Sequence, residues 1–225
     1  MRLKKASIFN SPFLGVYSVC NNDYTIVSSR IVEKEEKILK EYLDTKIIKL
    51  QIGLSSLIGV FLLGVKDHFV VDENVIEKRE VEILEKEGLK IKLIKSEFNA
   101  LGNLIAINSH YGIASPIVPD KVIKEISSFL KIEIKKEAIS GIELPGSSIY
   151  VNDNLFVVNP NISEKDFLNL KRNFKVPGIA TTLNYGDVFV GNDIIANNSA
   201  LLTGSTTSNI ELIKLDELVV EFDNK

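Results

Sequence analysis

Few residues in this sequence are of the types that carry out covalent or metal chemistry. The chain has one cysteine, Cys20, and two histidines, His68 and His110. A cysteine nucleophile needs a general base beside it, and a zinc site built on two histidines needs at least one further ligand. The spacing indicates no such convergence, so we expect both histidines to be turn residues and Cys20 to be a small buried residue. The sequence predicts no catalytic residue, no metal and no cofactor.

A phosphate-binding site is not indicated either. The stretch QIGLSSLIG around Gly53 lacks the lysine and the spacing of a P-loop. With 27 basic and 30 acidic residues the formal net charge is −3, which disfavours a surface whose main work is to neutralise phosphates. Runs such as EKEEKILKEYLD, rich in lysine and glutamate, are typical of solvated helix faces.

Composition places the chain among soluble globular proteins. Hydrophobic residues make up 45% of it, and we find no run of eighteen apolar residues and no signal-peptide core after the first five residues. A single cysteine excludes an internal disulfide framework and suits a reducing compartment. We therefore expect a cytoplasmic protein with no membrane partner and no small-molecule substrate.

The elements that must build any functional surface are marked by five glycines, spaced 44, 43, 44 and 45 residues apart. They are Gly15, Gly59, Gly102, Gly146 and Gly191. In four repeats an asparagine stands six residues after the glycine, whereas the second repeat has Val65 there. Because glycine weakens strands, its recurrence where an inner strand should begin predicts that neighbouring backbones approach closely at these points.

Each repeat reads as a hairpin, a helix and a third strand. After the glycine come a short apolar run, a polar turn and a second apolar run, the pattern of a β-hairpin. Apolar residues three and four apart then predict helices at Glu33–Leu43, Glu77–Glu87, Asp120–Leu130, Glu164–Phe174 and Asn209–Val219. A further strand-like run begins about a dozen residues before the next glycine, reading KIIKLQ, KIKLIK, IKKEAI and IATTLN in turn.

The fifth repeat lacks this last strand, but residues 3–8 (LKKASI) stand at the matching distance before Gly15. A strand missing at one end and extra at the other predicts a ring closed by the two chain ends, with Val219–Lys225 left as a short tail. The helix in each unit disfavours an all-β propeller, and the hairpins exclude stacked helical repeats. We therefore predict a single α/β domain over residues 1–225, a five-bladed α/β propeller with pseudo-fivefold symmetry. Such a ring gathers its five glycine junctions at one end, where they form a broad composite face.

The stretch NALGNLIAIN (residues 99–108) closely resembles the most characteristic segment of the translation initiation factor 6 family of archaea and eukaryotes, whose members prevent ribosomal subunits from associating. The stretches FLGV, IGLSSLIG, LPGSS and GSTTSNIEL resemble other segments of that family in the same order. The resemblance covers nearly the whole chain and implies the pentein fold, a five-bladed α/β propeller. The chain resembles the archaeal form, and Leu54 and Val65 depart from the family pattern.

This resemblance implies a monomeric translation factor that binds the large ribosomal subunit, chiefly through a uL14-type ribosomal protein with minor rRNA contact, and blocks joining of the small subunit. A role in large-subunit maturation stays open. The implied ribosome-binding residues surround the glycine junctions: Gly15, Val16, Gly59, Val60, Leu101, Gly102, Asn103, Gly146, Ser147, Gly191 and Asn192.

A pentein enzyme of the amidinotransferase or arginine-deiminase kind is the alternative, because that fold also carries guanidine-modifying enzymes. Such an enzyme needs a nucleophilic cysteine, a histidine and carboxylates that converge on one cavity. Here Cys20 lies in the first repeat, whereas His68 and His110 lie in hairpins of the second and third. The sequence favours the binding factor.

Overall fold

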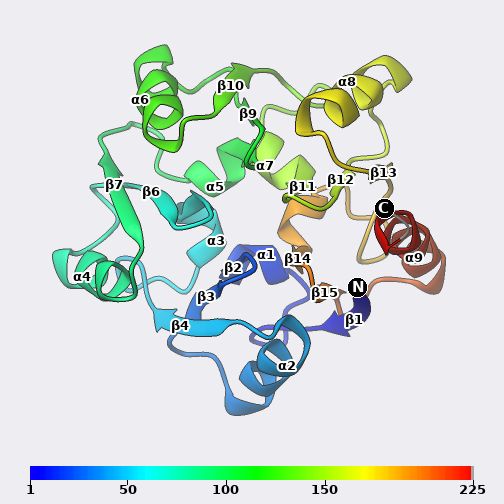
Figure 1. The fold of residues 1–225 in the computed structure, drawn as a ribbon, viewed down its shortest axis with the longest axis horizontal. Coiled ribbons are helices and arrows are strands. Elements are labelled where there is room, and N and C mark those ends of the chain that lie inside the picture. Colours follow the sequence, from blue (N-terminus) through cyan, green and yellow to red (C-terminus); the bar gives the residue numbers. More distant parts are fainter. Residues whose placement is uncertain (224–225) are drawn as a thin grey trace.

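The computed structural model describes residues 1–223, which form five small sheets arranged around a central axis (Figure 1). Each sheet has three strands, and each is flanked on its outer side by a helix. The five-bladed α/β propeller of the pentein type, predicted from the repeat, is confirmed.

The first blade shows how one repeat folds. Strands β2 (Ser18–Cys20) and β3 (Tyr24–Ser28) form an antiparallel hairpin, and helix α2 (Glu33–Leu43) leads to β4 (Lys46–Leu50), which pairs with β3 in parallel. A parallel pair requires such a crossover, because a tight turn joins only antiparallel neighbours. The chain therefore leaves the hairpin, runs back along the outside as a helix, and returns as a third strand.

The other blades repeat this order. The second contains β5 (Leu63–Val65), β6 (His68–Asp72), α4 (Lys78–Lys86) and β7 (Lys90–Ile94). The third contains β8 (Ile105–Ile107), β9 (Tyr111–Ala114), α6 (Asp120–Leu130) and β10 (Glu133–Lys136). The fourth contains β11 (Ile149–Val151), β12 (Phe156–Val158), α8 (Glu164–Phe174) and β13 (Gly178–Ala180). The fifth contains β14 (Ile194–Ala196), β15 (Ala200–Gly204), α9 (Asn209–Asp223) and, from the start of the chain, β1 (Arg2–Ala6).

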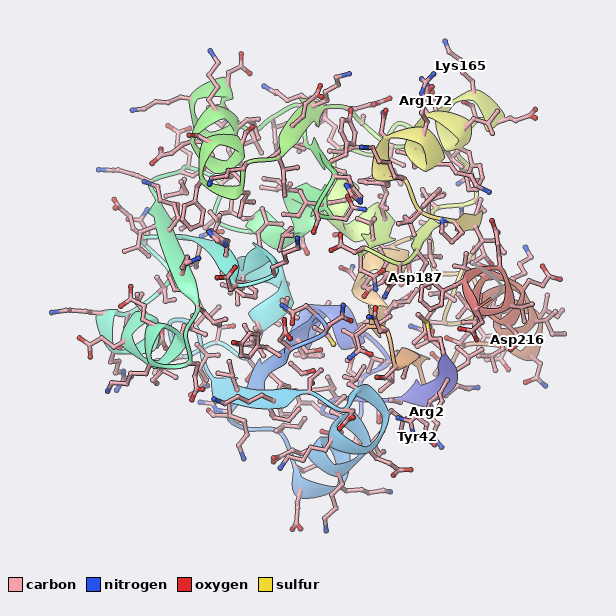
Figure 2. The ribbon with its side chains drawn as sticks, in the orientation of Figure 1. Arg2, Tyr42, Lys165, Arg172, Asp187 and Asp216 are labelled. Carbon is pink, nitrogen blue, oxygen red and sulfur yellow. The ribbon has the colours of Figure 1, made fainter. Side chains whose placement is uncertain are left out.

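The N-terminal strand closes the ring, as predicted. Strand β1 pairs with β15 in parallel, with Arg2 opposite Ala200 and Ala6 opposite Gly204. Polar contacts reinforce the pairing: the Arg2 guanidinium donates to the carbonyl oxygens of Glu41 (2.8 Å) and Tyr42 (2.7 Å) in the first blade. Figure 2 shows Arg2 beside Tyr42, and the guanidinium carbon lies 4.9 Å from the centre of the Tyr42 ring.

The apolar core lies between the blades. Within residues 1–223, each of five hydrophobic clusters draws buried side chains from two neighbouring blades. In one cluster, for example, Val70 of β6 packs with Ile126 of α6, and both side chains are fully buried. A helix thus covers its own sheet and the sheet of the preceding blade, so an isolated blade would leave one of its apolar faces in water.

Two local expectations were wrong. The glycines do not begin the inner strands but lie in one-turn helices before them: α1 (Leu14–Tyr17), α3 (Ile58–Phe61), α5 (Leu101–Leu104), α7 (Pro145–Ser148) and the 3-10 turn η1 (Val190–Asn192). The predicted tail is helical up to Asp223, where the Met1 amino group binds the Asp223 carboxylate at 2.8 Å. Residues 224–225 of that tail lie outside the described part of the chain.

Candidate docking face

The five glycines form a closed ring around the axis. A Cβ atom on Gly59 would overlap the carbonyl oxygen of Gly15, and the same relation links each later glycine to the one before it. The series returns to its start, because a Cβ on Gly15 would overlap the carbonyl oxygen of Gly191. The close backbone approach predicted from the spacing is confirmed, and its structural cause is that five one-turn helices meet at the centre.

Five linkers lead from the outer strands to these glycines, and we call them, with the glycine ring, the glycine end of the propeller. They cover residues 7–14, 51–58, 95–101, 137–145 and 181–190. Three linkers contain a turn whose backbone N–H groups donate to a buried glutamate near the start of a helix. The amides of Phe9 and Asn10 donate to Glu35 (3.0 and 3.1 Å), and the amide of Gly53 donates to Glu80 (2.9 Å).

We call these glutamates clamps, because each fixes the backbone of its turn. The third clamp is Glu211, which accepts from the amides of Tyr185 (3.2 Å) and Gly186 (3.0 Å) and from the hydroxyl of Thr182 (2.8 Å). Burial alone would raise the pKa of Glu211, but the hydrogen bonds that it accepts from Ser208, Thr182 and Gly186 outweigh burial and lower it. The ionised carboxylate therefore holds the turn in one conformation.

The clamped turns place large side chains in an unusual backbone conformation. Leu54 and Tyr185 both have a φ of 66°, in the left-handed region, which costs a residue with a side chain about 1–2 kcal/mol. Their side chains nevertheless remain 62% and 81% exposed. Neither residue is among the contact residues expected from the sequence. The available signals were the departure of Leu54 from the family pattern and the presence of a tyrosine within a turn-like linker.

The predicted contact residues lie at this end, but they are not equally accessible. Gly15, Val16, Gly59, Val60, Gly102, Asn103, Gly146, Gly191 and Asn192 are half-buried. Leu101 (0% exposed) and Ser147 (2%) are buried, so their side chains are not available to a partner. Four of the five glycines also line a cavity on the axis. The accessible face therefore consists of the half-buried junction residues and the linkers around them.

The opposite end of the axis carries the hairpin turns, and we call it the hairpin end. Four asparagines there bind their own turn and also reach the next blade. Asn197, for example, accepts from the amides of Ser199 (2.9 Å) and Ala200 (3.1 Å) and donates to the carbonyl of Leu43 (2.7 Å). Similar bonds from Asn21, Asn108 and Asn152 connect their blades to the following ones. Val65 has no such group, so this connection is missing between the second and third blades.

Cys20 lines the cavity at the hairpin end and is half-buried, not fully buried as expected from the sequence. Burial raises the pKa of the Cys20 thiol to about 12, against a smaller opposing effect of the hydrogen bond from Thr25. The side chains lining this cavity within residues 1–223 do not include a histidine. His110 lies exposed in its hairpin turn, as expected, whereas His68 is the first residue of β6 rather than a turn residue. The ring Nδ1 of His68 donates to the Asp67 carboxylate at 2.7 Å.

The structure also bears on metal binding and on membrane insertion. In the described part of the chain, no three His, Cys, Asp or Glu side chains are grouped so that they could hold a metal ion. Over the same residues, none of the helices combines the length and the apolar character that crossing a bilayer requires.

Comparison with known structures finds distant enzymes. The chain is similar to an adduct of dimethylarginine dimethylaminohydrolase with S-methyl-L-thiocitrulline, with 18% identity, a TM-score of 0.48, and coverage of 75% of this chain and 69% of that one. It is similar to the N-terminal domain of ArgZ, an arginine dihydrolase, with 14% identity, a TM-score of 0.47 and coverage of 75% and 68%.

Comparison with known sequences finds much stronger similarity. The chain is 35% identical over 215 residues to translation initiation factor 6 of Picrophilus torridus, covering 96% of this chain and 98% of the relative. It is 30% identical over 219 residues to translation initiation factor 6 of Staphylothermus marinus, covering 96% of each. The model of the eIF-6 family matches residues 3–218, a span that begins in β1, the strand that closes the ring, and runs through all five blades. This chain therefore belongs to the eIF-6 family.

Proposed function

We propose that this protein is a translation factor that binds the large ribosomal subunit and, by covering the surface it binds, prevents the small subunit from joining. The observation that carries the proposal is the family match along nearly the whole chain, together with relatives named translation initiation factor 6. A rigid ring suits steric exclusion, because it presents a broad face without first having to become ordered. Action in the cytoplasm as a monomer is part of the proposal.

The glycine end is the proposed docking face. Its five linkers contain one basic residue, Lys95, against the acidic residues Glu97, Glu137, Glu143 and Asp187. Such a face is poorly suited to phosphates and is complementary to a basic protein surface, so we propose a uL14-type ribosomal protein as the main partner and rRNA as a minor one.

The enzyme alternative is weakened by the state of Cys20. The nucleophile of such an enzyme is a thiolate, whereas a thiol with a pKa of about 12 is almost entirely protonated at neutral pH. Replacing Cys20 by serine is expected to leave subunit binding unchanged. If the wild type hydrolysed a guanidine compound and C20S did not, the interpretation of this protein as an enzyme would be correct.

Co-sedimentation with purified large and small ribosomal subunits tests the proposal directly. We expect binding to the large subunit alone, with a shallow dependence on salt because few phosphates are contacted. Equal binding to both subunits, or a salt slope corresponding to about six or more phosphate contacts, would contradict it.

Asn103 provides a test of the face itself. It is half-buried beside Gly102, and Asn103→Lys would place a cation and extra bulk against a basic partner. We expect binding to weaken by about 2–4 kcal/mol with little change in melting temperature. The matched control is Lys124→Glu, an exposed residue on α6, which is expected to bind like the wild type. The opposite pattern would place the docking face on the outer helices.

A further inference from the structure

The glycine end is not symmetric, although the fold nearly is. Three consecutive linkers around the ring, 181–190, 7–14 and 51–58, contain only one charged residue, Asp187. The other two, 95–101 and 137–145, contain Lys95, Glu97, Glu137 and Glu143. Figure 2 shows Asp187 well inside the molecular outline, in contrast to the peripheral Lys165 and Arg172 of α8. One part of the docking face is therefore apolar, and the other is charged.

The three weakly charged linkers expose large apolar side chains. Phe13 is 38% exposed, and Leu54 and Tyr185 are more exposed still. We call these three residues the apolar sector. The linkers that carry Phe13 and Tyr185 are joined directly, because the Asn184 amide donates to the carbonyl of Pro12 at 3.3 Å.

The backbone of the apolar sector is held in place while its side chains are left free. Each of the three linkers is clamped by one of the buried glutamates Glu35, Glu80 and Glu211, which are 7%, 4% and 6% exposed. At two of these turns the clamp maintains a left-handed leucine or tyrosine that lies mostly in water. Strained backbone that carries an exposed apolar side chain is more often found at sites of binding than elsewhere.

We propose that Leu54 and Tyr185, with Phe13 between them around the ring, are the apolar anchors that dock this protein onto its ribosomal partner. The partner surface is protein, with an apolar depression that receives these side chains and a basic margin that faces Glu97, Glu137 and Glu143. This inference rests on the proposed function and adds the orientation of binding. Aromatic side chains supply much of the binding energy at protein interfaces, and a side chain on a pre-ordered turn loses little freedom on binding.

The test uses two substitutions that separate binding from folding. Leu54→Gly and Tyr185→Asn remove an anchor and put a residue that tolerates the left-handed region in its place. We expect each variant to melt at or above the wild-type temperature and to bind purified large ribosomal subunits about tenfold more weakly. The control is Leu168→Gln on α8, where the leucine is 57% exposed, and its binding is expected to be unchanged.

The outcomes distinguish this inference from the function on which it rests. If the wild type binds large subunits and both anchor variants bind equally well, the assignment of the anchors is wrong, whereas the proposed function is not contradicted. If wild type does not bind large subunits, the proposed function itself fails. Leu54→Lys separates protein from RNA: weaker binding supports an apolar protein depression at this position, whereas tighter binding would overturn the inference in favour of rRNA phosphates.

Discussion

Asp193 lies in an environment that is unfavourable for its charged form. It follows η1, its side chain is fully buried, and neither carboxylate oxygen has a hydrogen-bond partner within residues 1–223. Burial, and then the nearby carboxylate of Asp187, raises its pKa from 3.8 to about 8. In the unfolded chain the group loses its proton near pH 4, and in the folded chain near pH 8. Between these values only the folded state holds the proton, so this residue's contribution to stability falls as the pH rises.

We therefore expect Asp193→Asn to raise the free energy of unfolding at pH 7.5, by about 1 kcal/mol, and to flatten its decline between pH 5 and pH 8. Urea unfolding across this pH range measures both effects. Asp216→Asn on the exposed side of α9 serves as the control and should change neither (Figure 2). A variant with the wild-type pH profile would mean that Asp193 is not the group responsible.

The glycine ring makes a second prediction for single residues. A methyl group on Gly102 would overlap the carbonyl oxygen of Gly59, and both groups belong to backbone at the crowded centre. Gly102→Ala is therefore expected to lower the free energy of unfolding by about 2–4 kcal/mol, although alanine has a higher helix propensity than glycine. Gly141→Asn is the comparison, because no atom lies within 4 Å of its added Cβ and asparagine tolerates its φ of 77°. Equal stability of the two variants would exclude crowding as the reason for the ring of glycines.

At the scale of elements, the hairpins show how one side chain links neighbouring blades. Four hairpins use an asparagine to cap their own turn and to reach the next blade, but the β5–β6 hairpin has Val65. Its turn differs accordingly, since Lys66 adopts a φ of 54°. A cavity lined by Val65, Ser109 and Leu130 lies at this junction.

Val65→Asn is expected to restore the missing connection and to stabilise the protein by about 1 kcal/mol, a typical net value for added hydrogen bonds. Thermal unfolding measures the effect, and amide hydrogen exchange in β5 and β8 shows whether the gain is local. Val65→Ala controls for loss of the valine and should destabilise. If Val65→Asn were no more stable than Val65→Ala, the asparagines would matter for their own turns rather than for the connection between blades.

At the scale of the whole molecule, ring closure and the shared core make the blades interdependent. The β1 strand pairs with β15 over five residues, and Lys5 donates to the Thr207 carbonyl at 2.6 Å. Deleting residues 1–9 would expose the edge of β15 and uncover the cluster that contains Ala6 and Ile8. We expect this deletion to lower the melting temperature by about 10 °C or more, or to cause aggregation. The protein is then expected to lose its single cooperative unfolding transition. Calorimetry measures this, and an unchanged melting profile would show that closure contributes nothing.

Much of the fold could be predicted because it depends on the local spacing of apolar residues in the sequence. The helices Glu33–Leu43, Asp120–Leu130 and Glu164–Phe174 have the predicted bounds, since their apolar spacing is regular and their ends carry recognisable signals. At one of them the hydroxyl of Ser163 accepts from the amide of Asp166 (3.1 Å). The five evenly spaced glycines likewise sufficed to predict the number of blades. Ring closure could be predicted because the fifth repeat lacks its last strand and must obtain it from elsewhere in the chain.

Only the tertiary structure could decide which residues reach the surface at the glycine end. Periodicity says which face of an element is apolar, but it does not say that a one-turn helix buries Leu101 and Ser147 while Asn103 stays accessible. The left-handed turns at Leu54 and Tyr185 depend on glutamates 26 residues away in the sequence, Glu80 and Glu211. Such contacts leave no local pattern, because they exist only after the ring has brought each linker onto the start of the following helix.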